Sequence, residues 1–171
     1  MAQIRSEGAG DAPAIRALHQ ASFPTPGEAA LVDALRSAGR LLVSLIAEEA
    51  GVVVGHVAFS PVRGAGARDG AALAPVAVLP AFRRRGIAER LIREGLAACR
   101  RSGRGFVVVL GDPPYYGRFG FLPAARWGLR SEYGDSDPFQ TLELRPDALP
   151  RGRGWSATRS SLPPSRVDER T

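Results

Sequence analysis

Six consecutive residues in the middle of the chain could bind a phosphate group. The run Arg83-Arg84-Arg85-Gly86-Ile87-Ala88 combines three guanidinium groups with one glycine. Glycine lets another molecule approach the backbone closely, and arginine suits phosphate oxygens. If a helix begins after this turn, its first backbone N–H groups lack partners and carry a partial positive charge. The run therefore predicts that backbone amides, mainly those of residues 85–88, hold an anionic phosphate.

The segments on either side of this turn have the patterns needed to position it. Before it stands LAPVAVLP, residues 73–80, a nearly unbroken apolar run that suits a strand covered on both faces. After it, apolar residues recur at helical spacing up to Cys99. A second apolar strand is predicted at residues 106–110, FVVVL. Strand, helix and strand in this order predict a parallel βαβ unit with a right-handed crossover.

The rest of the chain predicts further strands and helices around this unit. Turn residues and periodicity indicate helices from Asp11 to Pro24 and from Glu28 to Ala38, with Asp11 as N-cap of the first. A hairpin is expected from residues 41–48 and 52–61, and a flexible loop over residues 62–72. A short helix should follow Gly111, with strands near residues 127–130 and 139–144. Pro75 cannot donate to a strand ladder, so a bulge or a gap is expected there.

The phosphate-binding turn and two further motifs together resemble the GNAT superfamily of acetyl-CoA-dependent N-acetyltransferases. That signature has Arg or Gln, two residues, Gly, one residue, then Gly or Ala, placed between a central strand and a helix. Arg83, Gly86 and Ala88 occupy those positions. Phe59-Ser60-Pro61-Val62 and the segment YYGRFGF, residues 115–121, are similar to the SPV and YYxRFGF motifs of a predicted-acetyltransferase group within the superfamily.

The resemblance implies a fold and a division of the chain. The fold class expected is α/β (α+β): one domain with a mixed, mostly antiparallel sheet, a central parallel βαβ unit and flanking helices. Residues 1–150 would form the N-acetyltransferase domain. Residues 151–171 form a basic tail rich in Arg, Ser and Pro, which offers little to bury and is expected to be mobile.

The resemblance also implies acetyl-CoA as the co-substrate, with no metal. Its diphosphate would lie on the turn, and the backbone of the central strand would pair with the pantetheine arm. The cofactor-binding residues expected are Val76, Ala77, Val78, Arg83, Arg84, Arg85, Gly86, Ile87, Ala88, Tyr115 and Phe119.

Tyr116 is the expected catalytic residue, because the resemblance places the corresponding tyrosine near the CoA sulfur as general acid. A phenol with a pKa near 10 stays protonated at neutral pH and can still share its proton with a thiolate. The general base is open between Glu28, His56 and a chain of water molecules. His56 has a suitable intrinsic pKa, but its apolar surroundings favour a packed strand histidine. Cys99 lies on an apolar helix face, where a thiol is usually inert, so direct transfer in a ternary complex is expected over an acyl-cysteine route.

The acceptor is expected to be a primary amine on a small molecule or a peptide. Candidate substrate-binding residues are Phe23, Glu28, His56 and Phe59. An acyl-CoA sensor without turnover is the alternative, because no base is evident in the sequence. A dinucleotide-binding Rossmann enzyme is disfavoured, since the full G-x-G-x-x-G motif with a later acidic residue is missing.

Composition narrows the classes further. The 171 residues suit one domain. All 23 basic residues are arginine. With 17 acidic residues in the chain, the net charge is +6. Acids are interleaved with these arginines, which weakens the case for nucleic-acid binding. One cysteine and two histidines disfavour a disulfide framework or a metal centre. No apolar stretch spans a bilayer and no secretory signal is evident, so a cytoplasmic protein with no membrane partner is expected. The resemblance adds a homodimer as one expected state.

Overall fold

Seven strands form one sheet that runs through the protein. The computed structural model describes residues 1–62, 69–131, 138–149 and 156–157. The sheet has the order β1-β2-β3-β4-β5-β8-β6, and a separate pair joins β7 and β9. The strands of the sheet are β1 Gln3–Ser6, β2 Val43–Glu49, β3 Val52–Pro61, β4 Gly70–Val78, β5 Phe106–Leu110, β6 Leu122–Pro123 and β8 Phe139–Glu143. Strands β7 Arg130–Ser131 and β9 Ser156–Ala157 form the pair.

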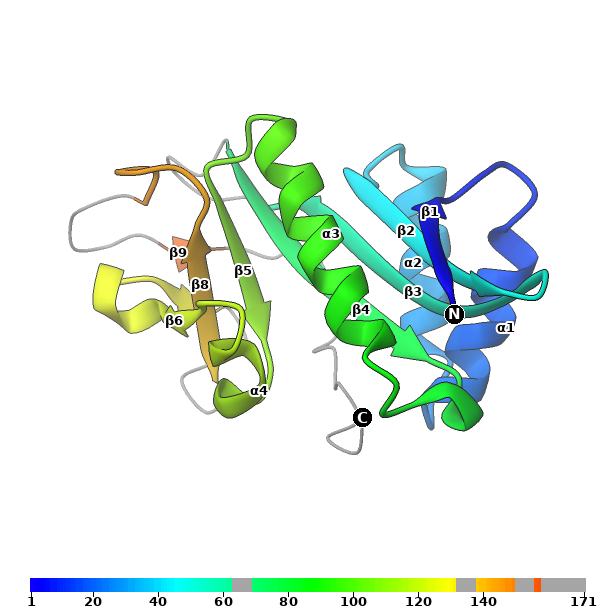
Figure 1. Ribbon diagram of the computed structural model, residues 1–171. Coiled ribbons are helices and arrows are strands. Elements are labelled where there is room, and N and C mark those ends of the chain that lie inside the picture. Colours follow the sequence, from blue (N-terminus) through cyan, green and yellow to red (C-terminus); the bar gives the residue numbers. More distant parts are fainter. Residues whose placement is uncertain (63–68, 132–137, 150–155, 158–171) are drawn as a thin grey trace.

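The pair β4–β5 is the one parallel contact of this sheet, and it is short. Gly70, Ala71 and Ala72 lie opposite Phe106, Val107 and Val108. Beyond these three positions β4 and β5 are no longer paired, and Figure 1 shows them separating toward their C-terminal ends. All other neighbours in the sheet are antiparallel. The predicted mixed, mostly antiparallel sheet with a central parallel βαβ unit is therefore confirmed.

Helices cover both faces of the sheet (Figure 1). They are α1 Ala12–Ser22, α2 Gly27–Ser37, α3 Ile87–Arg101 and α4 Pro113–Gly117. Helix α3 packs on β2, β3 and β4, and α1 packs on the other face of β3 and β4 beside α2. At its closest approach to the sheet, α3 presents Gly95 to the ring of Phe59, where no Cβ would fit. The main core lies between α3 and the sheet.

The break expected at Pro75 is present in the β3–β4 ladder. Val57 pairs with Val76 and Phe59 with Leu73, so two residues of β4, Ala74 and Pro75, lie opposite one residue of β3. The peptide bond between Ala74 and Pro75 is cis. This bulge confirms the interpretation of Pro75 and places a change of strand direction just before the segment expected to bind pantetheine.

Three local predictions differ from the structure. Residues 124–127 form a 3-10 helix rather than a strand, and only Arg130 and Ser131 are extended. The two-residue strand β6 was not predicted, because such a short strand has no readable period. Asp11 stands at the N-cap of α1 but does not cap it. Its carboxylate instead accepts hydrogen bonds from the backbone N–H of Gly8 and from Arg5.

Two predictions fall largely outside the described residues. Of the predicted tail, residues 151–171, only Ser156 and Ala157 are described, and they pair with β7. Residues 63–68 of the predicted loop are likewise not described. Within the described ranges, no helix has both the length and the apolar character required to cross a bilayer.

Candidate functional site

The turn before α3 exposes backbone amides at a helix N-terminus. The chain leaves β4 at Val78, makes one 3-10 turn at Pro80–Phe82 and enters α3 through Gly86. Gly86 has φ +73°, and a Cβ placed on it would have no other atom within 4 Å, so its Cα faces open space. Among the described residues, no side chain caps α3. Its first N–H groups therefore lack a side-chain partner and can receive an anion that approaches over the glycine.

The three arginines of this turn have different surroundings. Arg83 points inward, and its guanidinium donates to the carbonyl oxygens of Val78 (3.2 Å) and Ser22 (3.2 Å). Arg83 thus ties the turn to the end of β4 and to the end of α1. These hydrogen bonds hold the Arg83 guanidinium against the backbone, so Arg83 fixes the shape of the turn. The exposed positive charge beside the amides comes from Arg84 and Arg85.

Arg84 and Arg85 are exposed on the same turn. Arg85 pairs with Glu49 at 2.8 Å and lies over the ring of Phe82 at 5.1 Å. Arg84 has a left-handed backbone, with φ +58°, and no hydrogen bond or ion pair to the described residues. Its guanidinium is the one on this turn that can move to a ligand without breaking such a contact.

A pocket of about 250 Å³ joins this turn to α4. It is lined by residues from β4, the turn, the start of α3 and α4: Val78, Phe82, Arg83, Arg84, Gly86, Ile87, Ala88, Glu89, Tyr115 and Arg118. Six of these were predicted at the turn and β4, namely Val78, Arg83, Arg84, Gly86, Ile87 and Ala88, and Tyr115 was predicted on α4. Cationic and apolar walls beside uncapped amides fit a diphosphate joined to an organic group.

Arg118 was missed from the sequence, although it lies inside the YYGRFGF motif. Its guanidinium stacks on Tyr115 at 4.4 Å and lies 4.0 Å from Glu89. Phe119, which was predicted in the cofactor set, is nearly buried under Arg93 and Arg118 and packs in the main core. The alternation of aromatic and basic residues was the signal that could have identified Arg118.

The separation of β4 from β5 leaves one edge of β4 without a strand partner beyond Ala72. Val76, Ala77 and Val78 lie on this part of β4 and pair with β3 on the other side. The carbonyl oxygen of Val78 already accepts from Arg83 and, at 3.4 Å, from the Ser22 hydroxyl. The Leu79 N–H donates to Val54 of β3, so the backbone groups of Ala77, two residues earlier, also face β3 and those of Val76 face the free edge. An extended ligand could therefore join this edge mainly at Val76.

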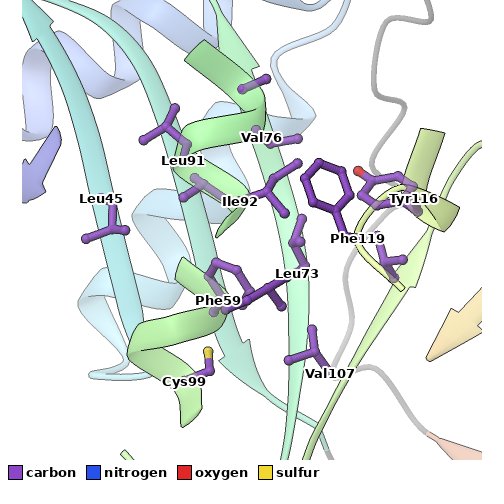
Figure 2. Packing of buried hydrophobic residues seen from close by; sticks show 14 of the residues in the cluster. Leu45, Phe59, Leu73, Val76, Leu91, Ile92, Cys99, Val107, Tyr116 and Phe119 are labelled. Carbon is purple, nitrogen blue, oxygen red and sulfur yellow. The ribbon is translucent and has the colours of Figure 1, made fainter. Parts of the chain in front are cut away.

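Tyr116 lies between the diverging strands with a buried hydroxyl. The residue has no exposed surface and packs with Leu73, Val76 and Phe119. Figure 2 shows its hydroxyl oxygen on the side of the ring that faces β4. Its hydroxyl has no hydrogen-bond partner among the described residues. Burial, followed by the neighbouring Tyr115, raises the pKa of Tyr116 far above its ordinary value, so the phenol keeps its proton at neutral pH.

A glycine fixes the position of this ring. A Cβ on Gly111, at the end of β5, would collide with the edge of the Tyr116 ring. The side chain of Asp112 accepts a hydrogen bond from the backbone N–H of Tyr115 at 3.0 Å and caps α4. The glycine and the cap together hold Tyr116 at the opening between the strands.

The structure divides the four predicted acceptor residues between the two faces of the sheet. Phe23 ends α1 and packs with Leu18 and Ala77. His56 faces α1, and Glu28 is nearly buried in the first turn of α2, where it accepts from the Thr25 hydroxyl. Phe59 faces α3 instead and is fully buried against Gly95.

His56 is a packed histidine, as its apolar surroundings favoured, but its partners were not predicted. It contacts His19 Nε2 through Nδ1 at 2.8 Å and the Ser44 hydroxyl through Nε2 at 2.9 Å. Burial first, and then the neighbouring His19 and Arg36, hold the pKa of His56 well below its ordinary value. Burial likewise lowers the pKa of His19 to about 4. Both imidazoles are therefore neutral at pH 7.

Cys99 is buried on the α3 face that contacts the sheet, as predicted. Burial raises the pKa of its thiol to about 12, so almost no thiolate is present at neutral pH. We expect the folded protein to resist thiol reagents at pH 7 and the Cys99→Ala variant to retain acetyl transfer. Thiol titration before and after unfolding checks the first point, and turnover checks the second. Loss of turnover in a folded Cys99→Ala protein would restore the acyl-cysteine route.

Among the residues that the structure describes, no three His, Cys, Asp or Glu side chains gather in a way that could hold a metal ion.

A family model and a relative of known sequence both match this chain to acetyltransferases. The model of the acetyltransferase (GNAT) family matches residues 12–121. The uncharacterized N-acetyltransferase YhbS of Escherichia coli K12 is 44% identical over 149 residues, which cover 85% of this chain and 89% of that protein.

Two solved structures extend the likeness to three dimensions. A crystal structure of E. coli YhbS in complex with CoA has a TM-score of 0.85 at 40% identity and covers 94% of both chains. A GNAT family acetyltransferase from Brucella melitensis in complex with acetyl-CoA has a TM-score of 0.77 at 42% identity and covers 94% of this chain and 97% of that one. With the family model matched over more than half of its length and a relative aligned over most of it, this chain belongs to the GNAT family of acetyltransferases.

Proposed function

We propose that this protein transfers the acetyl group of acetyl-CoA to a primary amine by direct attack in a ternary complex. The observation that carries the proposal is the pocket that joins the uncapped start of α3 to α4, the helix in which Tyr116, with its buried and protonated hydroxyl, follows the pocket residue Tyr115. The two similar structures with bound CoA and acetyl-CoA support the choice of cofactor.

Each part of the site has one role in this proposal. The amides of residues 85–88 hold the diphosphate, with Arg84 and Arg118 beside it, and the free edge of β4 at Val76 takes the pantetheine amides. Arg83 positions the turn. Tyr115 forms the apolar wall on α4, and Phe119 packs against it from the core. The departing thiolate receives its proton from Tyr116. Phe23 and Glu28 face the acceptor from the α1–α2 side.

The proposal is tested by incubating the protein with acetyl-CoA and primary amines while thiol release is followed. The panel contains spermidine, an aminoglycoside, a peptide with a free N-terminus, and a lysine peptide with a blocked one. Acetylation of at least one amine, confirmed by mass spectrometry, is the expected result. Binding of acetyl-CoA without turnover on a broad panel would favour the acyl-CoA sensor instead.

The Gly86→Ala variant tests the diphosphate site separately from turnover. Alanine at φ +73° is strained by about 1 kcal/mol, and its methyl group would project into the space where a ligand approaches the amides. We expect acetyl-CoA affinity, measured by calorimetry, to fall at least about tenfold.

Gly39→Ala is the matched control for this variant. Gly39 has φ +63°, open space around it and a position after α2, away from the pocket lining. It should show the same loss of stability with unchanged affinity. Equal affinities of the two variants and the wild type would remove Gly86 from the binding site.

A further inference from the structure

A chain of hydrogen bonds runs from the interior to the surface on the α1 side of the sheet. His19 Nε2 contacts His56 Nδ1, His56 Nε2 contacts the Ser44 hydroxyl, and that hydroxyl donates to Glu7. Glu7 follows β1 and pairs with Arg36 of α2 at 2.6 Å. His56 and Ser44 lie on the same face of neighbouring strands, since Ser44 is opposite Ala58 and Ile46 is opposite His56.

The chemistry of these four groups fixes the direction of every bond. Burial alone would raise the pKa of Glu7, but the hydrogen bonds from Arg36 and Ser44 lower it below its ordinary value, so Glu7 is a carboxylate and can only accept. The single hydroxyl proton of Ser44 is therefore used on Glu7, and Ser44 accepts from His56 Nε2–H. His56 is neutral, so its Nδ1 accepts from His19 Nε2–H.

This order leaves a bare nitrogen at the inner end of the chain. His19 Nδ1 must carry a lone pair, and it has no hydrogen-bond partner among the described residues. His19 has no exposed surface, and its ring stacks on Phe23 at 5.8 Å between centroids. A buried, unpartnered acceptor at the end of an ordered chain is costly unless a group or a water molecule binds there during function.

His19, at the inner end of the hydrogen-bond chain, lies on the α1 side of the sheet, next to the part of β4 that is not paired with β5. His56 is the β3 partner of Ala77, and Phe23, which stacks on His19, packs against Ala77. Ser22 and Arg83 fasten the end of α1 to Val78. The histidine pair thus lies beside Ala77, in the part of β4 that would bind the pantetheine arm.

We propose that His19 is the proton acceptor for the amine and that His56, Ser44 and Glu7 take up the proton in turn while the amine reacts. The proposal rests on the proposed function and supplies the general base that the sequence left open. Because His19 is fully buried, the proton reaches Nδ1 through one water molecule that enters with the acceptor.

One proton moves through the chain for each amine that reacts. The ammonium loses a proton and becomes the nucleophilic amine, and His19 Nδ1 gains one. His19 Nε2–H passes to His56 Nδ1, His56 Nε2–H to the Ser44 oxygen, and the Ser44 proton to Glu7. Glu7 is part-exposed, so this proton is in reach of solvent. After the products leave, Glu7 passes a proton back along the same bonds and His19 Nδ1 releases one to water in the emptied opening, which restores the first tautomers. The net change of the cycle is one proton passed from the ammonium to water.

The tautomers can be observed without any acceptor amine. These are the only two histidines of the chain, so a long-range ¹H–¹⁵N spectrum of tag-free protein shows no others. At pH 7 both rings should be neutral with the proton on Nε2. A proton on Nδ1 of His56 would reverse the chain and overturn the proposal.

The Ser44→Ala variant interrupts the chain without removing a histidine. If the hydrogen-bonded residues accept the proton of the amine, the Ser44→Ala variant can acetylate only amine that is already deprotonated in solution. Its kcat/KM should then fall on the order of 10²-fold at pH 7 and rise about tenfold per pH unit toward the pKa of the amine, while the wild type stays less dependent on pH. Acetyl-CoA affinity should not change. Glu7→Gln gives the same test at the outer end if Ser44→Ala does not fold.

Thr141→Val is the matched control. The Thr141 hydroxyl is also buried and donates to a backbone carbonyl, that of Val107, at 3.1 Å, far from the chain of histidines along the sheet. This variant should keep the wild-type pH profile. A wild-type profile in folded Ser44→Ala or Glu7→Gln would overturn the relay while leaving the acetyltransferase proposal intact. A wild-type protein that acetylates no amine would instead contradict the proposed function itself.

Discussion

Replacing Tyr116 by Phe should lower turnover by about 10²-fold or more while leaving the protein at least as stable as the wild type. The two effects have opposite signs because the hydroxyl is fully buried and has no hydrogen-bond partner among the described residues. A buried hydroxyl without a partner costs about 1–3 kcal/mol of desolvation, which its removal gives back. The ring itself, which fills the space beside Phe119 and Gly111, is retained.

Three measurements separate these effects. Turnover of the best amine of the panel reports the catalytic role, calorimetry with acetyl-CoA reports binding, and thermal unfolding reports stability. We expect a large loss in the first, no change in the second and an equal or higher Tm in the third. Wild-type turnover in the Phe variant would remove Tyr116 from the mechanism. A lower Tm would show that the hydroxyl has a stabilising partner in the folded protein.

The free energy of unfolding should fall by about 3 kcal/mol as the pH drops from 6.5 to 4, because of His19 alone. Its pKa is lowered from 6.5 to about 4 by burial, so the unfolded chain binds a proton in this range that the folded chain does not. Stability is fully present above pH 6.5 and is lost as the pH falls through this window. His56 acts in the same direction. Below the ordinary pKa of Glu7, protonation of the unfolded chain adds to the loss.

The charged groups around the histidine pair do not reverse this effect. Asp33 of α2 raises the pKa of His19, but Arg36 of the same helix lowers it, and burial is the larger cause. Urea unfolding at a series of pH values measures the slope, and the His19→Leu variant is the comparison. Its average slope between pH 6.5 and 4 should be shallower by about 1.2 kcal/mol per pH unit. Equal slopes would show that His19 is already protonated in the folded state.

The parts of the site that lie close together in sequence could be predicted from it. The turn at residues 83–88, the strands on either side and the bulge at Pro75 depend on local patterns, namely apolar runs, a glycine and a proline. Each of these restricts the backbone wherever it occurs, so the parallel β4–α3–β5 unit followed from the order of the patterns.

The parts that depend on side-chain direction and strand register could not be predicted. Arg83 lines the pocket as expected, but its hydrogen bonds to the carbonyl oxygens of Ser22 and Val78, 61 and 5 residues away along the chain, could not be read from the sequence. The chain from His19 to Glu7 draws on four separate segments, and only the β2–β3 register brings Ser44 beside His56. No spacing in the sequence reports such a meeting.

The short contact between β4 and β5 has a mechanical consequence. Strands β1 to β4 and strands β5, β8 and β6 are two parts of the sheet joined along this line by three paired positions and by the side chains that pack across it on both faces. When force is applied to the protein, we expect the sheet to separate first along this line between β4 and β5. A ligand bound from the α3 turn to Tyr116 would contact both parts of the sheet. Its binding would therefore stabilise the folded domain, and more so the higher its affinity.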